Sequence, residues 1–291
     1  MIILNEKTYA EECLRERRME KKPYKTISIL AKYYYHCMGY RKKKIEKLLK
    51  EYMSECYAKY EDHKILWDET IEKLARNAGK YTLYEINGIW ITTAELETIR
   101  SLNNNMLERL AFTLLCLAKL GNERSFKNNG WVNNDAKEIF TLARIPCSVD
   151  ERYENLGLLH ELGLLEFPKR LENLSCRVLY VNSDSDNEMF ISDFRELGYE
   201  YLNYLGGNFT RCCECDRLIR DNKKHTRRYC SDCIAPQQSD TKTVICVDCG
   251  KEFEVDKSNT RTNRCDDCYT SYRRKYKAEK EAERYQRDKK K

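Results

Sequence analysis

The sequence predicts a mainly α-helical protein that ends in two small cysteine-rich modules and a basic helix, and three observations lead to this prediction. Apolar residues recur at spacings of three and four along residues 9–73 and 106–162, as they do on the buried face of a helix. Nine of the 15 cysteines lie between Cys212 and Cys268. The tail, residues 270–291, carries 10 Lys and Arg against 4 Asp and Glu and contains neither glycine nor proline.

Residues 1–104 are predicted to form a helical N-terminal region, in which Gly39 separates two helices of regular apolar spacing. The segment 81–92 is rich in β-branched and aromatic residues. This composition favours either a short hairpin that turns at its Asn-Gly dipeptide or a loop between helices. Thr92, with a glutamate three residues later, forms a capping-box pattern, so a further helix is expected to begin directly after it.

Three helices are predicted next. The first, MLERLAFTLLCLAKLG, has a wide apolar face and is expected to end at Gly121. The second, DAKEIFTLAR, is capped by Asn134 or Asp135 and stopped by Pro146. The third, DERYENLGLLHEL, begins with the capping-box pattern SVDE and ends at Gly163.

Two strand-like runs, LLEF and LSCRVLYV, follow these helices and flank the turn PKRLEN. Three helices and a two-stranded hairpin, in this order, are typical of a winged helix-turn-helix. Residues 105–205 are therefore predicted to form a winged-helix-like domain, with residues 169–173 at the tip of the wing. Residues 183–188 are expected to be a polar turn, followed by a last helix over residues 190–207 that ends at a pair of glycines.

The third helix occupies the recognition position of this domain, but its charge leaves its role open. Arg152 on this helix, with Lys169 and Arg170 on the wing, suits contact with bases or phosphates. The same helix carries four acidic residues, which a polyanionic groove would repel. Contact with nucleic acid and docking of a protein partner are both compatible with this pattern.

The two cysteine-rich stretches repeat one spacing. Residues 212–233 read CCECDRLIRDNKKHTRRYCSDC and residues 246–268 read CVDCGKEFEVDKSNTRTNRCDDC, so each has two C-x-x-C pairs, 14 and 15 residues apart. Each tight C-x-x-C turn brings two sulfurs to one ion, and a second turn completes the tetrahedron that zinc prefers. Gly250 favours such a turn. The predicted zinc ligands are Cys212, Cys215, Cys230, Cys233, Cys246, Cys249, Cys265 and Cys268.

These ligand sets predict two zinc ribbons, over residues 206–237 and 242–270, in which a short β-hairpin joins the two pairs. Each set supplies four thiolates and leaves no coordination position for water, so the two zinc ions are expected to be structural rather than catalytic. Modules this small need the metal in order to fold. Cys213 is left out of the predicted ligand set, because Cys212 has the C-x-x-C spacing to Cys215. Cys213 is therefore either a spare thiol or an alternative ligand.

Basic residues gather at the two ends of the chain. Residues 1–50 have a net charge of +8 and residues 270–291 one of +6, whereas residues 51–269 have one of −8. A polyanionic partner is therefore expected to meet the ends. The tail, residues 271–291, is predicted to be a helix on which basic residues lie among tyrosines. This mixture suits phosphate contact and stacking, although a merely solvated helix has the same pattern. The predicted nucleic-acid contacts are Lys223, Lys224, Arg227, Arg228, Arg273, Arg274, Lys275 and Lys277, with Arg152, Lys169 and Arg170 of the central domain.

With its helical N-terminus, winged-helix-like centre and the motif CVDCGKEFEVDKSNTRTNRCDDC before a basic tail, the chain resembles uncharacterised phage and prophage proteins of Firmicutes. The resemblance implies a phage or mobile-element setting and transfers no catalytic residue.

The leading hypothesis is a non-enzymatic, zinc-containing protein that binds nucleic acid, DNA before RNA, in transcriptional regulation or DNA replication. The sequence has four histidines and contains no P-loop, no G-x-S-x-G and no G-x-G-x-x-G motif, so no enzyme class is indicated. The alternative is a protein-interaction factor that modulates or inhibits a host or phage enzyme. The apolar run in the opening segment is too short for a signal peptide, and no apolar run elsewhere is long enough to span a membrane. A cytoplasmic location in a bacterial host is therefore expected.

Overall fold

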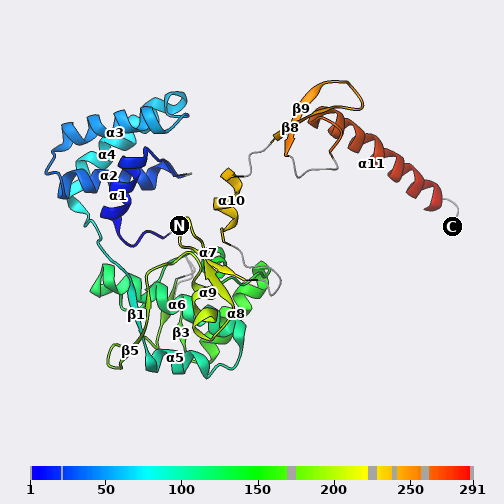
Figure 1. The fold of residues 1–291 in the computed structure, drawn as a ribbon. Coiled ribbons are helices and arrows are strands. Elements are labelled where there is room, and N and C mark those ends of the chain that lie inside the picture. The colour runs from blue at the N-terminus through cyan, green and yellow to red at the C-terminus, as the bar shows by residue number, and fades with distance from the viewer. Residues whose placement is uncertain are drawn as a thin grey trace. The chain divides into compact units, whose positions relative to one another are not determined.

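The computed structural model describes residues 2–20, 22–168, 175–221, 228–237, 241–256 and 262–288. Over these residues the protein is mainly helical, with small antiparallel sheets, as the sequence predicts. The chain divides into two compact units, residues 1–209 and 210–291, which are described separately. Figure 1 shows the order of the elements along the chain.

Four helices form the N-terminal part of the first unit (Figure 1): α1 (Glu6–Glu16), α2 (Pro23–His36), α3 (Lys42–Cys56) and α4 (Lys64–Asn77). Short 3-10 turns, η1 (Glu61–His63) and η2 (Ala78–Lys80), flank α4. Their apolar faces share one core, which includes Ile27, Leu30, Ile45, Leu49, Met53 and Ile71. Gly39 has a φ of +66° between α2 and α3, a left-handed conformation that glycine adopts without strain, so the predicted break is confirmed.

Of the two structures that the sequence favoured for residues 81–92, the hairpin is wrong: residues 81–88 are mostly loop, and residues 89–92 form a single strand. Strand β1 (Ile89–Thr92) pairs instead with β5 (Asn187–Ile191), far along the chain, with Ile89 opposite Ile191. Ile91 is buried and Trp90 is exposed, so the side chains alternate across the strand that the β-branched and aromatic composition indicated, and its partner is a distant segment. The same pairing corrects the C-terminal side, because residues 187–191 are a strand and the last helix, α9 (Leu197–Tyr204), is shorter than expected.

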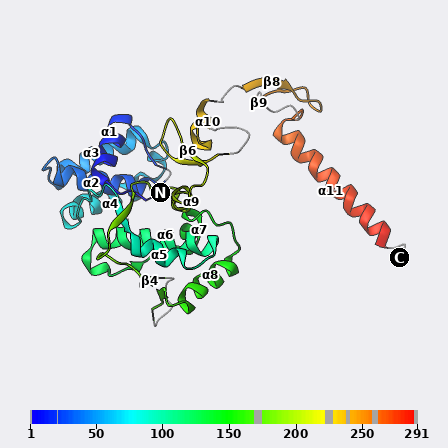
Figure 2. The same ribbon diagram turned by 60° about the horizontal axis from the view of Figure 1, so that its bottom comes forward.

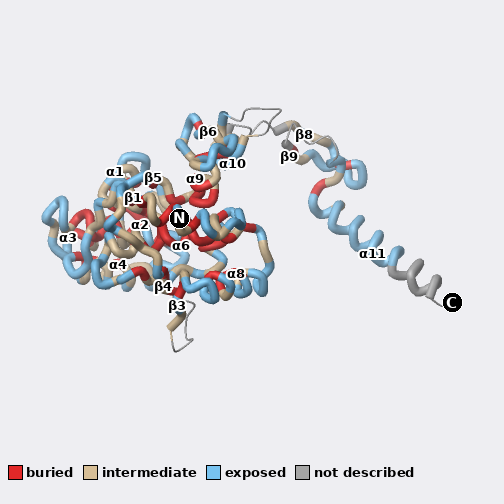
Figure 3. The backbone as a smooth tube through the Cα atoms, turned by 90° about the horizontal axis from the view of Figure 1, so that it is seen from below, coloured by how far each residue is buried: buried red, intermediate tan, exposed pale blue. Residues whose placement is uncertain are grey.

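Two helices after β1 build the centre of the second core. The capping box at Thr92 is confirmed and opens α5 (Thr93–Arg100). Helix α6 (Asn105–Arg124) is buried along most of its length and appears red in Figure 3. It passes through Gly121 instead of ending there. Gly121 packs against the side chain of Asn128 in the 3-10 turn η3 (Phe126–Asn128), which a Cβ at this position would displace.

A carboxylate is buried between these two helices. Glu95 of α5 accepts hydrogen bonds from Lys119 Nζ on α6, at 2.8 and 2.9 Å, and from the backbone amides of Thr92 and Asn182. Its side chain is inaccessible to solvent. The pair links α5, α6 and the chain segment before β5.

The remaining elements of the first unit follow in the order β2 (Trp131–Val132), α7 (Ala136–Leu142), α8 (Val149–Glu161), β3 (Leu165–Glu166) and β4 (Cys176–Val178). Figure 2 shows α7, α8 and β4 with α6. The three strands form an antiparallel sheet in which β4 lies between β2 and β3. Asp135 caps α7 and the capping box at Ser148 opens α8, as expected. Helix α7 ends at Leu142, before Pro146, because Arg144 takes a left-handed φ of 55°. The predicted tip of the wing lies outside the described residues.

The second unit holds two modules of the same plan. The first consists of β6 (Phe209–Arg211), β7 (Leu218–Arg220) and α10 (Ser231–Gln237); its first strand begins at the end of the first unit. The second consists of β8 (Thr241–Ile245), β9 (Glu252–Asp256) and α11 (Asp266–Asp288). In each module the two strands pair with each other and the helix follows them.

Candidate metal centres

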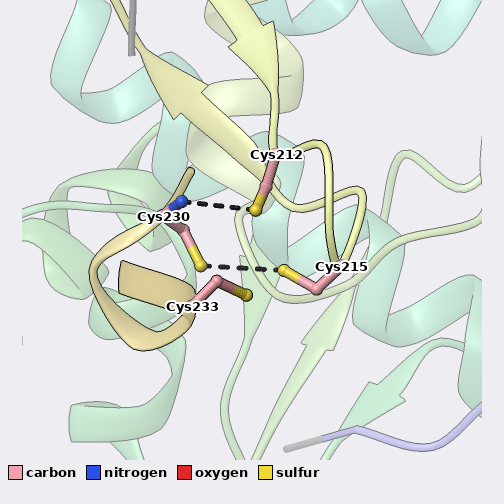
Figure 4. A group of neighbouring side chains, drawn as sticks. All are labelled: Cys212, Cys215, Cys230 and Cys233. Atoms are coloured by element: carbon pink, nitrogen blue, oxygen red, sulfur yellow. Dashed lines mark hydrogen bonds between the residues drawn. The ribbon is translucent and has the colours of Figure 1, made fainter. Parts of the chain in front are cut away.

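The first pair of cysteines in the first module lies in the turn between β6 and β7. The amide of Cys212 donates to the carbonyl of Arg217 (2.9 Å) and the amide of Asp216 to the carbonyl of Cys212 (2.9 Å), which closes a tight loop. Asp216 has a φ of +58°. The second pair, Cys230 and Cys233, lies at the beginning of α10, and the four sulfurs converge as Figure 4 shows.

The geometry of this cluster fits a tetrahedral zinc ion. The four Sγ atoms all lie within 4.8 Å of one another, and Cys215 Sγ is 3.6 Å from Cys230 Sγ (Figure 4). Four sulfurs at ~2.3 Å from one tetrahedral ion would be ~3.8 Å apart, so the observed separation needs little adjustment. The prediction of a four-thiolate site at Cys212, Cys215, Cys230 and Cys233 agrees with this arrangement.

Backbone amides stabilise negative charge on one of these sulfurs. The amide of Cys230 donates to Cys212 Sγ at 3.3 Å. Burial raises the pKa of the Cys212 thiol, but the amides of Cys215, Cys230 and Glu214 outweigh burial and lower that pKa to about 6. A thiolate, the form that binds zinc, is therefore favoured at neutral pH.

The second module repeats the arrangement. Cys246 and Cys249 lie in the turn between β8 and β9, where the amide of Gly250 donates to the carbonyl of Cys246 (2.9 Å). Cys265 immediately precedes α11 and Cys268 lies in its first turn. The four sulfurs again lie within 4.8 Å of one another, with Cys249 Sγ 3.7 Å from Cys265 Sγ. The amide of Cys265 is the main group that lowers the pKa of the Cys246 thiol to about 6.

Gly250 has a φ of +70°, so the left-handed turn that its identity predicted is present. Asp216 is its counterpart, four residues after the first cysteine in each module, and sequence reasoning missed it. Aspartate tolerates this conformation better than most residues, which is the signal that could have identified it.

One detail of the predicted ribbons differs from the structure. The hairpin was expected to join the two pairs of cysteines, whereas its strands flank the first pair and the second pair begins a helix. The hairpin turn holds the first pair of cysteines close together, and the first turn of the helix does the same for the second pair. The four sulfurs therefore still converge on one point. The clusters are consistent with two structural zinc sites of four thiolates each.

Cys213 lies outside both clusters. Its side chain is exposed, and its backbone amide donates to the carbonyl of Arg228 (2.9 Å), so it contributes to the fold of the loop through the backbone. The structure thus places Cys212, and not its neighbour, among the converging sulfurs.

The predicted nucleic-acid contacts are only partly covered by the described residues. Lys169, Arg170, Lys223, Lys224 and Arg227 lie outside them. Arg228 is exposed beside the first metal centre.

Arg152 is half-buried at the beginning of α8, where its Nη2 donates to the carbonyl of Cys147 at 3.3 Å. It borders an open groove of about 730 Å³ with Lys137, Tyr153 and Ser175.

Helix α11 carries the remaining four predicted contacts, and they are exposed: Arg273, Arg274, Lys275 and Lys277. From Tyr269 to Lys280 every residue of this helix is exposed, as the pale blue tube in Figure 3 shows. Five Lys and Arg against one Glu give this stretch a net charge of +4.

No protein-family model matches the chain, and neither a curated protein nor a solved structure matches it. The resemblance to phage and prophage proteins therefore stays a prediction. Among the described residues, no helix is both long enough and apolar enough to cross a membrane.

Proposed function

We propose that the protein is a non-enzymatic, zinc-containing nucleic-acid-binding protein of phage or mobile-element origin, acting in transcriptional regulation or DNA replication. The observation that carries the proposal is helix α11, which leaves the second metal centre directly and presents a net charge of +4 between residues 269 and 280. Phosphate contacts by Lys and Arg supply most of the affinity of proteins for nucleic acid. The metal centres would fix the direction of this helix.

The proposal assigns no catalytic role to the metal centres. Each one offers four thiolates to its ion, and a zinc ion with four protein ligands has no position left for water or substrate. The centres would hold the two modules in shape, since each module buries few apolar side chains of its own.

For residues 105–205 we propose a winged-helix fold. The order α6, β2, α7, α8, β3, β4, with β4 between β2 and β3, supports this fold. Helix α8 would occupy the recognition position. Among the described residues of this domain, the beginning of α8 and the groove bordered by Lys137 and Arg152 would offer a contact with a duplex.

A second function is favoured by the exposed face of α8, which suits a protein partner better than DNA. The exposed residues include the acidic Asp150, Glu151, Glu154 and Glu161 and the apolar Val149, Tyr153, Leu158 and Leu162. A polyanion would be repelled by this face, whereas a basic and apolar protein surface would complement it. The alternative function is therefore a protein-interaction factor that modulates or inhibits a host or phage enzyme.

A truncated chain that ends at Gly206 separates the two functions, because the first unit has two hydrophobic cores of its own. If nucleic acid is the partner, zinc-loaded full-length protein binds random duplex DNA or single-stranded RNA at low salt. The truncated chain, shown to be folded by circular dichroism, binds much more weakly, because it keeps the groove at α8 and lacks α11. Absence of binding by the full-length protein would overturn the proposal. Stoichiometric capture of an enzyme by the truncated chain would support the alternative instead.

A further inference from the structure

Three tyrosines form a stripe along helix α11. Tyr269, Tyr272 and Tyr276 are three and four residues apart, so they share one face of the helix. Their exposed fractions are 50%, 45% and 50%, and the rings of Tyr272 and Tyr276 are nearly parallel, with centroids 6.3 Å apart. Residues with this spacing usually bury an apolar face, but the neighbouring positions of the helix are exposed as well.

Each ring of the stripe has a cation beside it. Arg264 lies 4.4 Å from the centroid of Tyr272, Arg273 lies 5.9 Å from that of Tyr269, and Lys280 lies 5.8 Å from that of Tyr276. A cation over one face of an aromatic ring leaves the other face for a stacked base and places a phosphate contact close to that base. An uncharged apolar partner would need neither the basic residues nor the polar edge of tyrosine.

The stripe is connected to the second metal centre. Arg264, which precedes the ligand Cys265, donates from Nε to Asp248 Oδ2 at 2.7 Å. Asp248 lies between the ligands Cys246 and Cys249. The guanidinium that lies over one face of Tyr272 is thus held by the loop that carries two of the sulfurs, while Tyr272 stays 45% exposed.

We propose that α11 is a stacking platform for single-stranded nucleic acid, on which unpaired bases stack against Tyr269, Tyr272 and Tyr276 while the basic side chains contact the phosphates. The proposal rests on the proposed nucleic-acid-binding function and specifies its substrate class. In a duplex the bases are stacked on one another and paired, so their faces are not available to the tyrosines; a duplex contacts the same helix through its phosphates alone. The second metal centre positions the platform through Asp248 and Arg264.

The test compares the zinc-loaded full-length protein with its Tyr272→Ala variant by fluorescence anisotropy. The probes are a labelled single-stranded oligonucleotide of mixed sequence and the duplex formed by that strand and its complement. Loss of one stacked base is expected to weaken single-strand binding by about 5- to 150-fold, while duplex binding changes less than twofold. The slope of single-strand affinity against salt concentration should stay the same, because no charge is removed.

Two matched variants control for nonspecific effects. Tyr272→Phe keeps the ring and should bind the single strand nearly as the unaltered protein does. Tyr81→Ala removes a comparably exposed tyrosine of the first unit and should leave binding unchanged. The three tyrosine variants should retain two zinc ions per chain, which shows that the modules are intact.

Three results would overturn the stacking inference in distinguishable ways, and a fourth would reject the positioning role of the metal centre. Equal loss of single-strand and duplex binding in Tyr272→Ala would reject stacking. No loss of either would also reject stacking, but the proposed nucleic-acid binding itself would still stand. A protein dimer that dissociates on the Tyr272→Ala substitution, seen by sedimentation velocity, would make the stripe a contact between copies of the chain. Unchanged single-strand binding by Cys246→Ser would reject the positioning role of the metal centre.

Discussion

The substitution Cys265→Ser tests whether metal binding folds the second module. Cys265 is buried, with its sulfur 3.7 Å from that of Cys249, and serine leaves three thiolates where the geometry provides four. In the described part of this module, Val255 is the one buried apolar side chain besides the cysteines. Burying one valine contributes about 1.5–3 kcal/mol, whereas a structural zinc ion contributes about 10–16 kcal/mol at neutral pH. The metal term is several times larger, so its loss should unfold the module.

The expected result is one zinc ion per chain in place of two, measured by metal analysis of the purified protein. Hydrogen exchange should show the amides of β8 and β9 exchanging as in an unfolded peptide, while helices α1 to α9 keep their protection. Cys213→Ser is the matched control, since that thiol is exposed outside both clusters, and it should keep both ions. A Cys265→Ser protein with two zinc ions, or with protected β8 and β9, would refute the reasoning.

Three further substitutions have defined outcomes. Cys212→Ser should lower the zinc content to one ion per chain; retention of two would show that Cys213 can replace the lost ligand. Glu95→Ala should lower the free energy of unfolding by about 3–5 kcal/mol in a urea titration, because the ammonium of Lys119 loses the buried carboxylate that balances it, and a loss below about 1 kcal/mol would contradict this. Gly198→Ala should cost about 1–3 kcal/mol, since a Cβ there would overlap a backbone carbonyl in the loop after α7; an unchanged thermal midpoint would disprove the overlap.

Features that depend on neighbouring residues were predictable from the sequence. The capping boxes at Thr92 and Ser148 begin helices where expected, because the hydroxyl and the glutamate three residues later satisfy amides of the same turn. The two sets of four cysteines converge as their spacing indicates, because a C-x-x-C turn fixes two sulfurs locally.

Features that depend on distant residues were not predictable. The strand at residues 89–92 was recognisable by its β-branched and aromatic composition, but nothing in it specifies β5 as the partner, because the pairing is set by the packing of Ile89 and Ile191 into one core. Gly121 resembles a helix terminator, and only the position of Asn128 reveals that it is a packing site within α6.

The candidate site shows the same division. Basic residues and two of the tyrosines of α11 stood out by composition, and the helix is present. The contact of Arg264 with Asp248 and with the ring of Tyr272 could not be foreseen, because it depends on how the metal-binding turn folds back toward the helix. The regular spacing of Tyr269 with the other two tyrosines was the signal available for the stripe.

The central claim is that basic side chains of α11 contact phosphates, and the most direct measurement is the salt dependence of binding. Affinity of the zinc-loaded protein for single-stranded nucleic acid would be measured across a salt series, beside a variant in which Arg273, Arg274, Lys275 and Lys277 are all glutamine. Each lost phosphate contact lowers the slope of log affinity against log salt by about 0.7, so the account predicts a slope smaller by about 3 and weaker binding. Equal slopes for the two proteins, or no binding by either at low salt, would contradict the account.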